Sequence, residues 1–493
     1  MPEIFVSSDM DLILTGTRNT TTKPASAVKT INGKPAVEYM TQAAKDFFRS
    51  FIDSQADWNQ LFSNSAAENS GSHSPFEAVS YYPGYTNFTL TFTNGTTVTE
   101  EWTAATLSDF TDVMNAPYPA PAAVQEVLGA GGFITGYFLN RSSTAVLSLP
   151  SFHFEGEIAQ LTAASTIAEF LAKCKAGGMK RLVIDLQANG GGLIDALFPT
   201  TMPFAGSQLR LPPSAELMGL TRGSANASMV AQNVSATYYY GTYLNFEGKG
   251  FPNWPSVINQ QTQKGDKFTN TLRVNFTKTD QVLEAQGINT QRAPQYFAAK
   301  DILLLTDGRC SSTCAIFAEE MHQVGVKIVV AGGRPEPGPM QGVRSIREIN
   351  SSLPASCFPA NGSSPFSGDA KSNVINLRNQ IRKSQQDVPL HFVYQTAECR
   401  FFYTAKMLTD YSVLWQYAAD ALWSNQGLCA QGSTNHTSSG INVTTITGVG
   451  KNDGTNGTTS TTNVSFTGSG NSNGGLNAAL LSGAMVCFAL LLL

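Results

Sequence analysis

Three stretches of almost unbroken apolar residues lie in the middle of the chain, at 181–186, 301–306 and 327–331. Strands buried on both faces show this pattern, whereas strands with one solvent-exposed face alternate apolar and polar residues. Between the second and third stretches the sequence predicts a helix that begins near Ser312 and ends near Gln323. Strand, helix and strand in this order predict a parallel α/β layer.

Two further elements precede this layer. Residues 144–149 are predicted to form a strand, and residues 163–176 have the apolar spacing of an amphipathic helix. A connector rich in proline and glycine, residues 116–132, separates them from the N-terminal part of the chain. The length of 493 residues is likewise typical of two to three domains.

The N-terminal part combines short strands with a helix. Residues 27–35 form a predicted strand that runs into an Asn-Gly turn, and residues 37–51 carry apolar side chains at helical spacing. Residues 89–92 and 96–99 flank Asn94-Gly95, which predicts a hairpin with a type I′ turn. This pattern favours a small peptide-binding module.

The C-terminal part has no periodic pattern. Residues 431–470 consist almost entirely of Ser, Thr, Asn and Gly, which cannot bury enough apolar area to fold, so we expect a disordered stalk. Small residues followed by an apolar run from Leu476 to the end make 471–493 a predicted GPI-anchor signal. The alternative is a transmembrane tail anchor, but no basic residue follows the run to hold a cytosolic side.

The composition indicates a protein of the secretory pathway. Charged residues make up only 14% of the chain, against roughly 25% in ordinary soluble domains. A net charge of -4 without a basic run gives no sign of nucleic-acid binding. Dense acceptor motifs for N-glycosylation in a charge-poor chain indicate a glycoprotein. The candidate acceptors in the predicted domains include Asn87, Asn94, Asn140, Asn226, Asn233 and Asn275.

The cysteines and the N-terminus give two further expectations. Seven cysteines without a CxxC pair, together with only five histidines, argue against a zinc site and favour one to three disulfides whose pairing stays open. Residues 1–6 contain neither the charged nor the apolar region of a signal peptide. We therefore expect that a segment carrying the signal peptide precedes Met1 in the native protein.

Two loops that follow buried strands carry groups suited to catalysis. In the first, 189–192, three consecutive glycines let backbone N–H groups approach an anion without obstruction by Cβ atoms. In the second, 310–314, two serines stand where a helix begins. Each has an ordinary alternative, since glycine-rich turns are common and a serine at a helix start is often only a cap. The functional interpretation is a nucleophile whose developing oxyanion faces the helix N-terminus and the glycine loop.

Together the two loops resemble the C-terminal-processing, or tail-specific, serine peptidase family. The segments that carry the resemblance are 184–192 and 306–317, and they look like the CPAF-like secreted branch of the family, which is common in fungi. Residues 27–39 resemble the PDZ-like domain of that branch. The resemblance covers residues 1–430. It implies an α/β fold, with a crotonase/ClpP-like tail-specific protease domain preceded by a small PDZ-like β-rich domain.

The resemblance also implies roles for particular residues. Ser312 matches the nucleophile of the family, and Ser311 is the second candidate. The oxyanion hole is expected from the backbone N–H of Gly191 or Gly192 together with that of Thr313.

The base that activates the serine is the open question. Better-known members use a lysine, but the corresponding stretch here, 334–337, contains none, which points to the Ser-His-Glu version of the CPAF-like branch. Glu398 is the candidate for the carboxylate that orients the histidine. In that branch the histidine precedes the PDZ-like domain, so we expect it in the missing N-terminal segment, with His153 as the candidate within the chain. The other histidines lie in a loop, a helix, an apparent strand and the stalk, and they are His73, His322, His391 and His436.

The sequence therefore predicts a serine-type endopeptidase at the cell surface, held by a GPI anchor. It would act on protein or peptide substrates, with no metal or organic cofactor and no nucleic-acid partner. The alternative is a catalytically inactive pseudo-peptidase that binds extended peptides at the cell surface. The expected parts are a PDZ-like domain at 1–105, a peptidase domain at 106–430, the stalk at 431–470 and the anchor signal at 471–493.

Overall fold

The computed structural model of the chain contains two compact units. The first comprises residues 1–217, 276–347 and 395–442, and the second comprises residues 218–275, 348–394 and 443–493. The residues that the structure describes are 4–6, 12–14, 26–47, 53–62, 64, 66–67, 87–101, 118, 120, 123–129, 134–152, 157–192, 217–221, 243–257, 260–263, 265–274, 296–343, 378–382 and 389–434. The predicted anchor signal and all but the start of the predicted stalk lie outside these residues.

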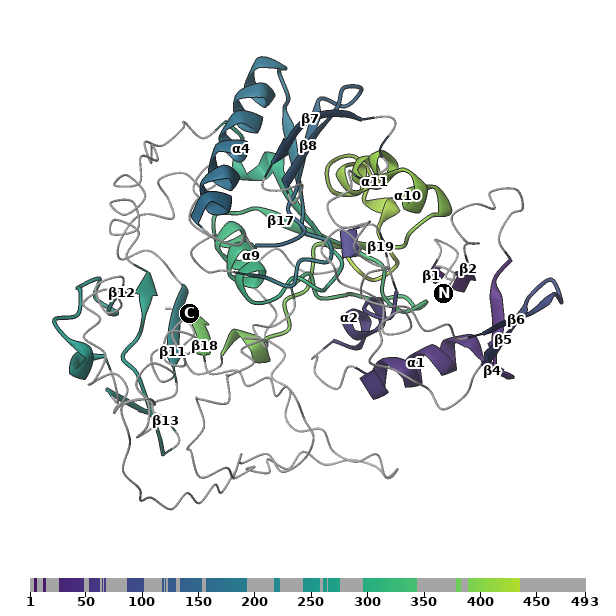
Figure 1. Ribbon diagram of the computed structural model, residues 1–493, viewed down its shortest axis with the longest axis horizontal. Coiled ribbons are helices and arrows are strands. Elements are labelled where there is room, and N and C mark those ends of the chain that lie inside the picture. The colour runs from purple at the N-terminus through teal and green to yellow at the C-terminus, as the bar shows by residue number, and fades with distance from the viewer. Residues whose placement is uncertain are drawn as a thin grey trace. The chain divides into compact units, whose positions relative to one another are not determined.

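A seven-stranded sheet is the main element of the first unit (Figure 1). Its order is β19-β17-β16-β10-β9-β8-β7, with the five strands from β19 to β9 parallel and β8 and β7 antiparallel. The predicted parallel layer of 181–186, 301–306 and 327–331 is confirmed. The strands are β7 (Val124–Gly129), β8 (Ile134–Leu139), β9 (Thr144–Ser148), β10 (Arg181–Asp185), β16 (Ile302–Thr306), β17 (Lys327–Ala331) and β19 (Cys399–Phe401).

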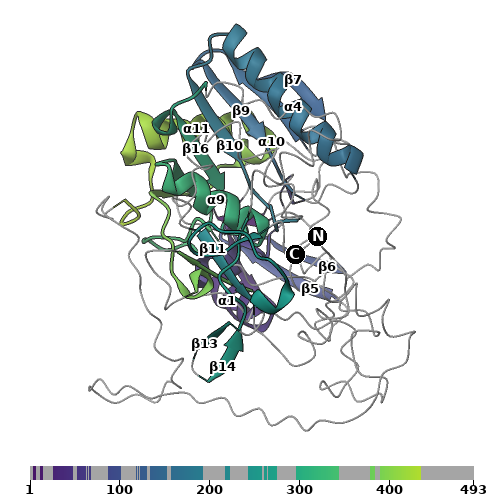
Figure 2. The same cartoon turned by 90° about the vertical axis from the view of Figure 1, so that its left-hand side faces the viewer.

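Helices cover both faces of this sheet, which explains why its central strands are apolar on both sides. Figure 1 shows α4 and α9 on one face and α10 and α11 on the other, and in Figure 2 β16, β10 and β9 follow one another across the sheet. The predicted helix at 163–176 begins earlier than expected, and the predicted helix after Ser312 is confirmed. The helices are α4 (Glu157–Ala176), α9 (Thr313–Gln323), α10 (Ala405–Thr409) and α11 (Tyr411–Trp423).

One core of the unit lies between the sheet and α11. Val183, Leu305 and Val329 belong to three neighbouring parallel strands and pack in one buried cluster with Leu414 and Trp415 of α11. Because the carboxyl ends of parallel strands meet at one edge of a sheet, this core fixes the loops after β10, β16 and β17 next to each other.

The N-terminal module is a four-stranded sheet, β4-β3-β5-β6, packed against α1. The predicted helix at 37–51 is described from Ala36 to Phe47. The first Asn-Gly pair, Asn32-Gly33, forms the two-residue turn between β3 and β4, with φ +50° and +76°. The elements are β3 (Val28–Ile31), β4 (Lys34–Pro35), α1 (Ala36–Phe47), α2 (Ser54–Asn59), β5 (Asn87–Phe92) and β6 (Thr97–Glu101).

The second Asn-Gly pair corrects one prediction. The hairpin of β5 and β6 is present, but its turn is not type I′, because only Gly95 has a positive φ, of +85°. Gly95 N donates to Phe92 O at 3.0 Å and Phe92 N donates to Thr96 O at 2.8 Å. These bonds close a three-residue loop with a glycine bulge, the next most common hairpin connection after the two-residue turns.

The N-terminal module shares its core with the peptidase sheet. Phe402, directly after β19, is buried in the cluster that contains Met40 of α1, Trp58 of α2 and Leu90 of β5. α2 is itself almost entirely buried. The module is therefore packed into the first unit rather than tethered to it.

The remaining elements are short. A β-pair near the N-terminus and the 3-10 segments η6 and η9 belong to the first unit, whereas most of the other pairs belong to the second. They are β1 (Ile4–Val6), β2 (Leu12–Leu14), β11 (Leu217–Thr221), β12 (Tyr243–Leu244), η5 (Trp254–Ser256), β13 (Gln261–Gln263), β14 (Asp266–Phe268), β15 (Arg273–Val274), η6 (Ala299–Asp301), β18 (Arg378–Arg382), η8 (Leu390–Phe392) and η9 (Gln426–Leu428).

Candidate active site

The loop after β16 turns into α9 at Ser312. This residue is the N-cap of the helix and has φ +51° and ψ -123°, a conformation that residues with a Cβ rarely adopt. Holding a non-glycine residue there costs about 1–3 kcal/mol, and such residues cluster at functional sites. The side chain of Ser312 makes no cap hydrogen bond. Capping therefore does not account for a serine at this position.

The two candidate serines have different surroundings. Ser311 is 1% exposed, and its Oγ donates to the carbonyl of Gly190 at 2.9 Å. Ser312 is partly exposed, and no described residue forms a hydrogen bond with its Oγ. Of the two hydroxyls, that of Ser312 is the one available to a substrate.

The glycine loop after β10 lies directly against Ser312. A Cβ at Gly191, whose φ is +105°, would be 2.6 Å from Ser312 Cβ and 2.7 Å from Ser311 O. Thr313 Oγ1 donates to Gly192 O at 2.6 Å, and Ser311 N donates to Asn189 O at 3.3 Å. Only glycine fits at position 191, and the two loops are joined by hydrogen bonds on both sides of this contact.

The backbone N–H groups around Ser312 are not equally available. Gly191 N donates to Asn189 Oδ1 at 2.8 Å, so this group is already paired within the loop. The bridge between Phe152 and Gly192 uses the carbonyl of Gly191, which accepts from Phe152 N at 2.8 Å. Within the part of the chain that the structure describes, the N–H groups of Gly192 and Thr313 have no acceptor.

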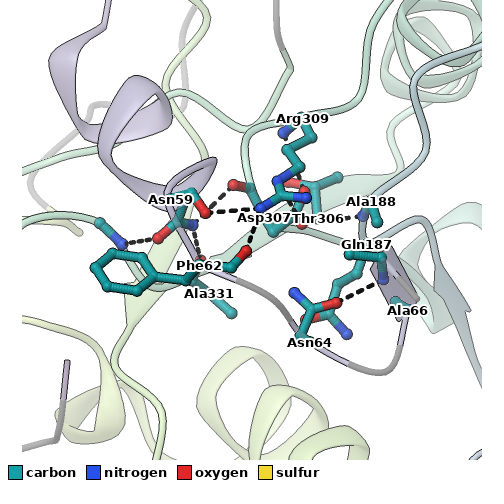
Figure 3. Close-up of polar contacts among 12 residues, drawn as sticks. Asn59, Phe62, Asn64, Ala66, Gln187, Ala188, Thr306, Asp307, Arg309 and Ala331 are labelled. Atoms are coloured by element: carbon teal, nitrogen blue, oxygen red, sulfur yellow. Dashed lines mark hydrogen bonds and ion pairs between the residues drawn. The ribbon is translucent and has the colours of Figure 1, made fainter. Parts of the chain in front are cut away.

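A buried carboxylate, Asp307, joins the loops from behind. Asp307 Oδ2 accepts from Ala188 N at 2.9 Å, and Oδ1 accepts from Arg309 N at 3.0 Å (Figure 3). Arg309 Nε lies 3.7 Å from Asp307 Oδ2, with both side chains under 10% exposed. Sequence reasoning missed this residue, although an Asp-Gly pair after a buried strand marks the same turn.

A second buried carboxylate, Asp185, ends β10 below the glycine loop. Its Oδ2 accepts from Trp415 Nε1 at 2.7 Å, and its Oδ1 accepts from Gln187 N at 3.0 Å. Burial raises the pKa of Asp185 to about 6, opposed by these hydrogen bonds and assisted by the nearby Asp307. Asp185 therefore braces the loop from inside the protein.

Asn59 of α2 brings the N-terminal module to the same loops. Its Nδ2 donates to Asp307 O at 2.8 Å and to Ala331 O at 2.7 Å, and its Oδ1 accepts from Gly333 N at 2.6 Å (Figure 3). Arg309 Nη2 donates in return to Asn59 O at 2.8 Å. The side-chain amide of Asn59 thus connects the ends of β16 and β17. No sequence motif identifies Asn59 as a residue with this role.

The structure does not bring Glu398 to Ser312. Glu398 precedes β19 at the amino edge of the parallel strands, where its Oε2 accepts from Ile328 N at 2.7 Å. Its Oε1 lies 3.9 Å from His322 Nδ1, near the C-terminal end of α9. With a rise of 1.5 Å per residue, the two ends of α9 are about 15 Å apart. The apparent strand at 392–394 is also corrected, since 390–392 is the 3-10 segment η8.

The loop at 334–337, which contains no lysine, is held by an arginine from β19. Arg400 is fully buried, and its guanidinium donates to the carbonyls of Gly332, Glu336 and Gly338 at 2.8–3.2 Å. Arg334 Nη2 pairs with Glu336 Oε2 at 3.4 Å. These contacts give the loop a structural role and supply no neutral amine that could act as a base.

Only some of the other predicted positions lie in the part of the chain that the structure describes. Asn87, Asn94 and Asn140 are exposed, whereas Asn226, Asn233, Asn275, His73, His153 and His436 lie outside the described residues. His391 lies in η8. Across the described ranges no group of three His, Cys, Asp or Glu side chains could hold a metal ion, and no helix there has the length and apolarity to cross a membrane.

Comparison with known proteins agrees with this architecture. The family model for a CPAF-like PDZ domain matches residues 1–111, and that for peptidase family S41 matches residues 143–355. The peptidase S41 family protein ustP of Aspergillus flavus is 27% identical, over 78% of this chain and 98% of that protein. The S41 family protein phomP1' of Diaporthe leptostromiformis is 24% identical, over 86% and 80%. A structure of mature CPAF complexed with lactacystin aligns with a TM-score of 0.42 and 13% identity, over 86% of this chain and 82% of that one.

The family models identify the class that the chain matches as the S41 peptidases, a family of serine-type hydrolases. The match to a CPAF-like PDZ domain ahead of the peptidase match makes the CPAF-like members the part of that family to which the chain is similar. The resemblance found in the two loops is thereby confirmed, as is the predicted fold.

Proposed function

We propose that this chain is a serine endopeptidase whose nucleophile is Ser312. The observation that carries the proposal is the position of this residue, at a strained turn between the glycine loop and the first turn of α9. Its hydroxyl is partly exposed and has no hydrogen-bond partner among the described residues. A serine hydroxyl in such a place is free to approach a carbonyl carbon, whereas a hydroxyl that caps a helix through a hydrogen bond is not.

In the proposed reaction a base takes the proton of Ser312 Oγ while the oxygen attacks the scissile carbonyl. The negative charge on the carbonyl oxygen is stabilised by the N–H groups of Gly192 and Thr313, with the N-terminus of α9 adding a favourable field. Collapse of the intermediate gives an acyl-enzyme, the protonated base donates its proton to the leaving amine, and water then releases the acyl group. The hydrogen bond from Gly191 N to Asn189 favours Gly192 over Gly191 as the donor.

The base is proposed to be a histidine from outside the described residues. One source is a segment that precedes Met1, and the other is His153, which follows Phe152 in the chain. Phe152 pairs with Gly192, and its ring lies 5.5 Å from that of Phe317 in α9. His153 is the next residue in the chain after Phe152. Loss of activity in His153→Ala would support the second source, and unchanged activity would exclude it.

The test of the nucleophile is labelling with a fluorophosphonate probe, which reacts with activated serines. We expect Ser312→Ala to abolish labelling and Ser311→Ala, whose hydroxyl is bonded to Gly190, to retain it. Peptide mapping of the labelled protein locates the adduct. Equal labelling of the parent and Ser312→Ala would exclude the assignment.

The alternative, a pseudo-peptidase that binds peptides without cleaving them, has one observation in its favour. His322 is the only histidine whose side chain the structure describes, and it lies at the end of α9 remote from Ser312. If no histidine reaches Ser312, the chain would retain only the weak catalysis of an oxyanion hole. Absence of labelling together with measurable binding of extended peptides would establish this alternative.

We propose separately that the protein is held at the cell surface by a GPI anchor. It rests on the density of acceptor motifs and on the apolar run that ends the chain. Exposure of Asn87, Asn94 and Asn140 in the structure is compatible with glycosylation. Release of the protein from intact cells by a phosphatidylinositol-specific phospholipase tests the anchor, and a protein that is not released would exclude it. An increase in gel mobility after removal of N-glycans tests glycosylation, and an unchanged mobility would exclude it.

A further inference from the structure

The two cysteines that flank the nucleophile candidate are bonded to each other. Cys310 precedes the turn and Cys314 lies in the first turn of α9, with their Cα atoms 5.2 Å apart. Both side chains are 0% exposed. The disulfide therefore closes a ring of five residues whose central member is Ser312.

The ring is also joined to the glycine loop, where Ser311 N donates to Asn189 O at 3.3 Å and Thr313 Oγ1 donates to Gly192 O at 2.6 Å. The side chain of Ser312 does not cap α9, so the usual hydrogen bond that fixes a helix start is missing. Within the turn, Cys314 N donates to Ser311 O at 3.0 Å and Ile316 N donates to Ser312 O at 3.1 Å. Because the conformation of Ser312 is unfavourable for a residue with a Cβ, these hydrogen bonds act against a tendency of the turn to relax, and a covalent link acts in the same sense.

A relaxed turn would carry Ser312 away from its position. The Cβ of Ser312 packs against Gly191, so closely that a Cβ added to this glycine would lie 2.6 Å from it. A rotation about φ of Ser312 would change the direction of Oγ relative to the N–H groups of Gly192 and Thr313. The disulfide between Cys310, before the turn, and Cys314, in the helix after it, opposes that rotation.

We propose that the Cys310–Cys314 disulfide is a positioning element for the reaction, which holds Ser312 Oγ in line with the glycine loop. This proposal rests on the proposed function, in which Ser312 is the nucleophile. Reduction by a dithiol adds two electrons and two protons, gives two protein thiols and leaves the reagent as its own disulfide. The reduced protein should keep its fold but react slowly, so the activity would depend on an oxidising environment.

The chain offers a matched control in its second described disulfide. Cys399–Cys429 joins the start of β19 to the residue after η9, with a sequence separation of 30. It lies in the same unit but does not enclose Ser312. Removing either disulfide would lower the general stability of the protein, whereas only removing Cys310–Cys314 would disturb the position of Ser312.

The experiment compares Cys310→Ser/Cys314→Ser with Cys399→Ser/Cys429→Ser by fluorophosphonate labelling and by circular dichroism. Labelling is measured over a range of probe concentrations, which separates the maximal rate kinact from the half-saturating concentration KI. We expect the first variant to lose at least tenfold in kinact with KI within twofold of the parent. The second variant should label at the parental rate at 25 °C, even where its Tm is lower.

A second measurement covers the case in which the first variant does not fold. The Cys399→Ser/Cys429→Ser protein is treated with dithiothreitol under native conditions, and the thiols are alkylated and mapped by mass spectrometry. Labelling should fall as the 310–314 peptide becomes alkylated and should return on reoxidation of an unalkylated sample. Two results would overturn the positioning role and leave the proposed function untouched. The first is that labelling persists after Cys310–Cys314 is reduced, and the second is that Cys399→Ser/Cys429→Ser loses as much labelling as Cys310→Ser/Cys314→Ser. A parent protein that does not label at Ser312 would overturn the proposed function and this inference together.

Discussion

At the scale of single residues, the buried carboxyl group of Asp185 makes the stability of the fold depend on pH. Its folded-state pKa is raised from 3.8 to about 6, chiefly because the carboxyl group is buried. Between these values the folded protein binds a proton that the unfolded chain has already released. The free energy of unfolding should therefore fall as pH rises from about 4 to about 6 and level off above, by on the order of 3 kcal/mol.

Chemical unfolding at several pH values in this window measures the effect. Asp185→Asn removes the titrating group and should flatten the slope, although it also exchanges an acceptor of Trp415 Nε1 for an amide. Asp46→Asn on the exposed side of α1 is the matched control and should leave the slope unchanged. Identical slopes in the parent and Asp185→Asn would contradict the prediction.

Residues whose role depends on nearby sequence could be predicted, and those that depend on distant contacts could not. Ser312 and Gly191 stand in short motifs directly after buried strands, so the chain order alone brings them to one sheet edge. Asn59 contacts Asp307, 248 positions away, through a helix with no motif. Glu398 precedes β19, and a residue before a parallel strand lies at the amino edge of the sheet, opposite the loops that follow β10 and β16.

At the scale of elements, the glycine loop packs closely against the start of α9. Gly191→Ala would place a Cβ within 2.7 Å of both Ser312 Cβ and Ser311 O, in a backbone with φ +105°. The loop or the turn must then shift. We expect labelling of Ser312 to fall by a hundredfold or more and the free energy of unfolding to fall by about 1–3 kcal/mol.

The neighbouring glycine provides the control. A Cβ at Gly190 would meet nothing within 4 Å, and its φ is not in the left-handed region. Gly190→Ala should therefore label within a fewfold of the parent, with its carbonyl still accepting from Ser311 Oγ. Similar losses of labelling in Gly190→Ala and Gly191→Ala would contradict the prediction, because they would show that the loop tolerates no side chain at either position and that the contact with Ser312 is not the cause.

Turn geometry shows how far sequence alone defines an element. Both Asn-Gly pairs lie between strands of the N-terminal module, yet only Asn32-Gly33 forms a two-residue turn with positive φ at both positions. At Asn94-Gly95 the register of β5 and β6 pairs Thr91 with Thr97, which leaves too many residues for that turn. Strand register depends on packing across the sheet, so the dipeptide predicts the hairpin but not its loop.

At the scale of the molecule, the sequence predicts two modules in series but not how they share a core. The composition of the connector at 116–132 marks the end of one module and the start of the next. Nothing in the sequence shows that Phe402, after the last strand of the peptidase sheet, packs among Met40, Trp58 and Leu90. Such contacts between segments far apart in the chain follow from tertiary packing alone.

The shared core leads to a prediction about truncation. A chain lacking residues 1–105 would expose Phe402, which is 7% exposed in the intact unit. It would also leave Asp307 O, Ala331 O and Gly333 N without the amide of Asn59. Each buried polar group without a partner costs about 1–3 kcal/mol, and the lost apolar contacts add to this, so the sum is comparable to the whole stability of a domain. We expect the truncated protein to be insoluble or to lack a cooperative unfolding transition, as measured by soluble yield and thermal circular dichroism, while Asn59→Ala in the full chain remains folded with a lower Tm. A truncated protein that unfolds cooperatively and labels at Ser312 would mean instead that the N-terminal module is dispensable for the active-site loops.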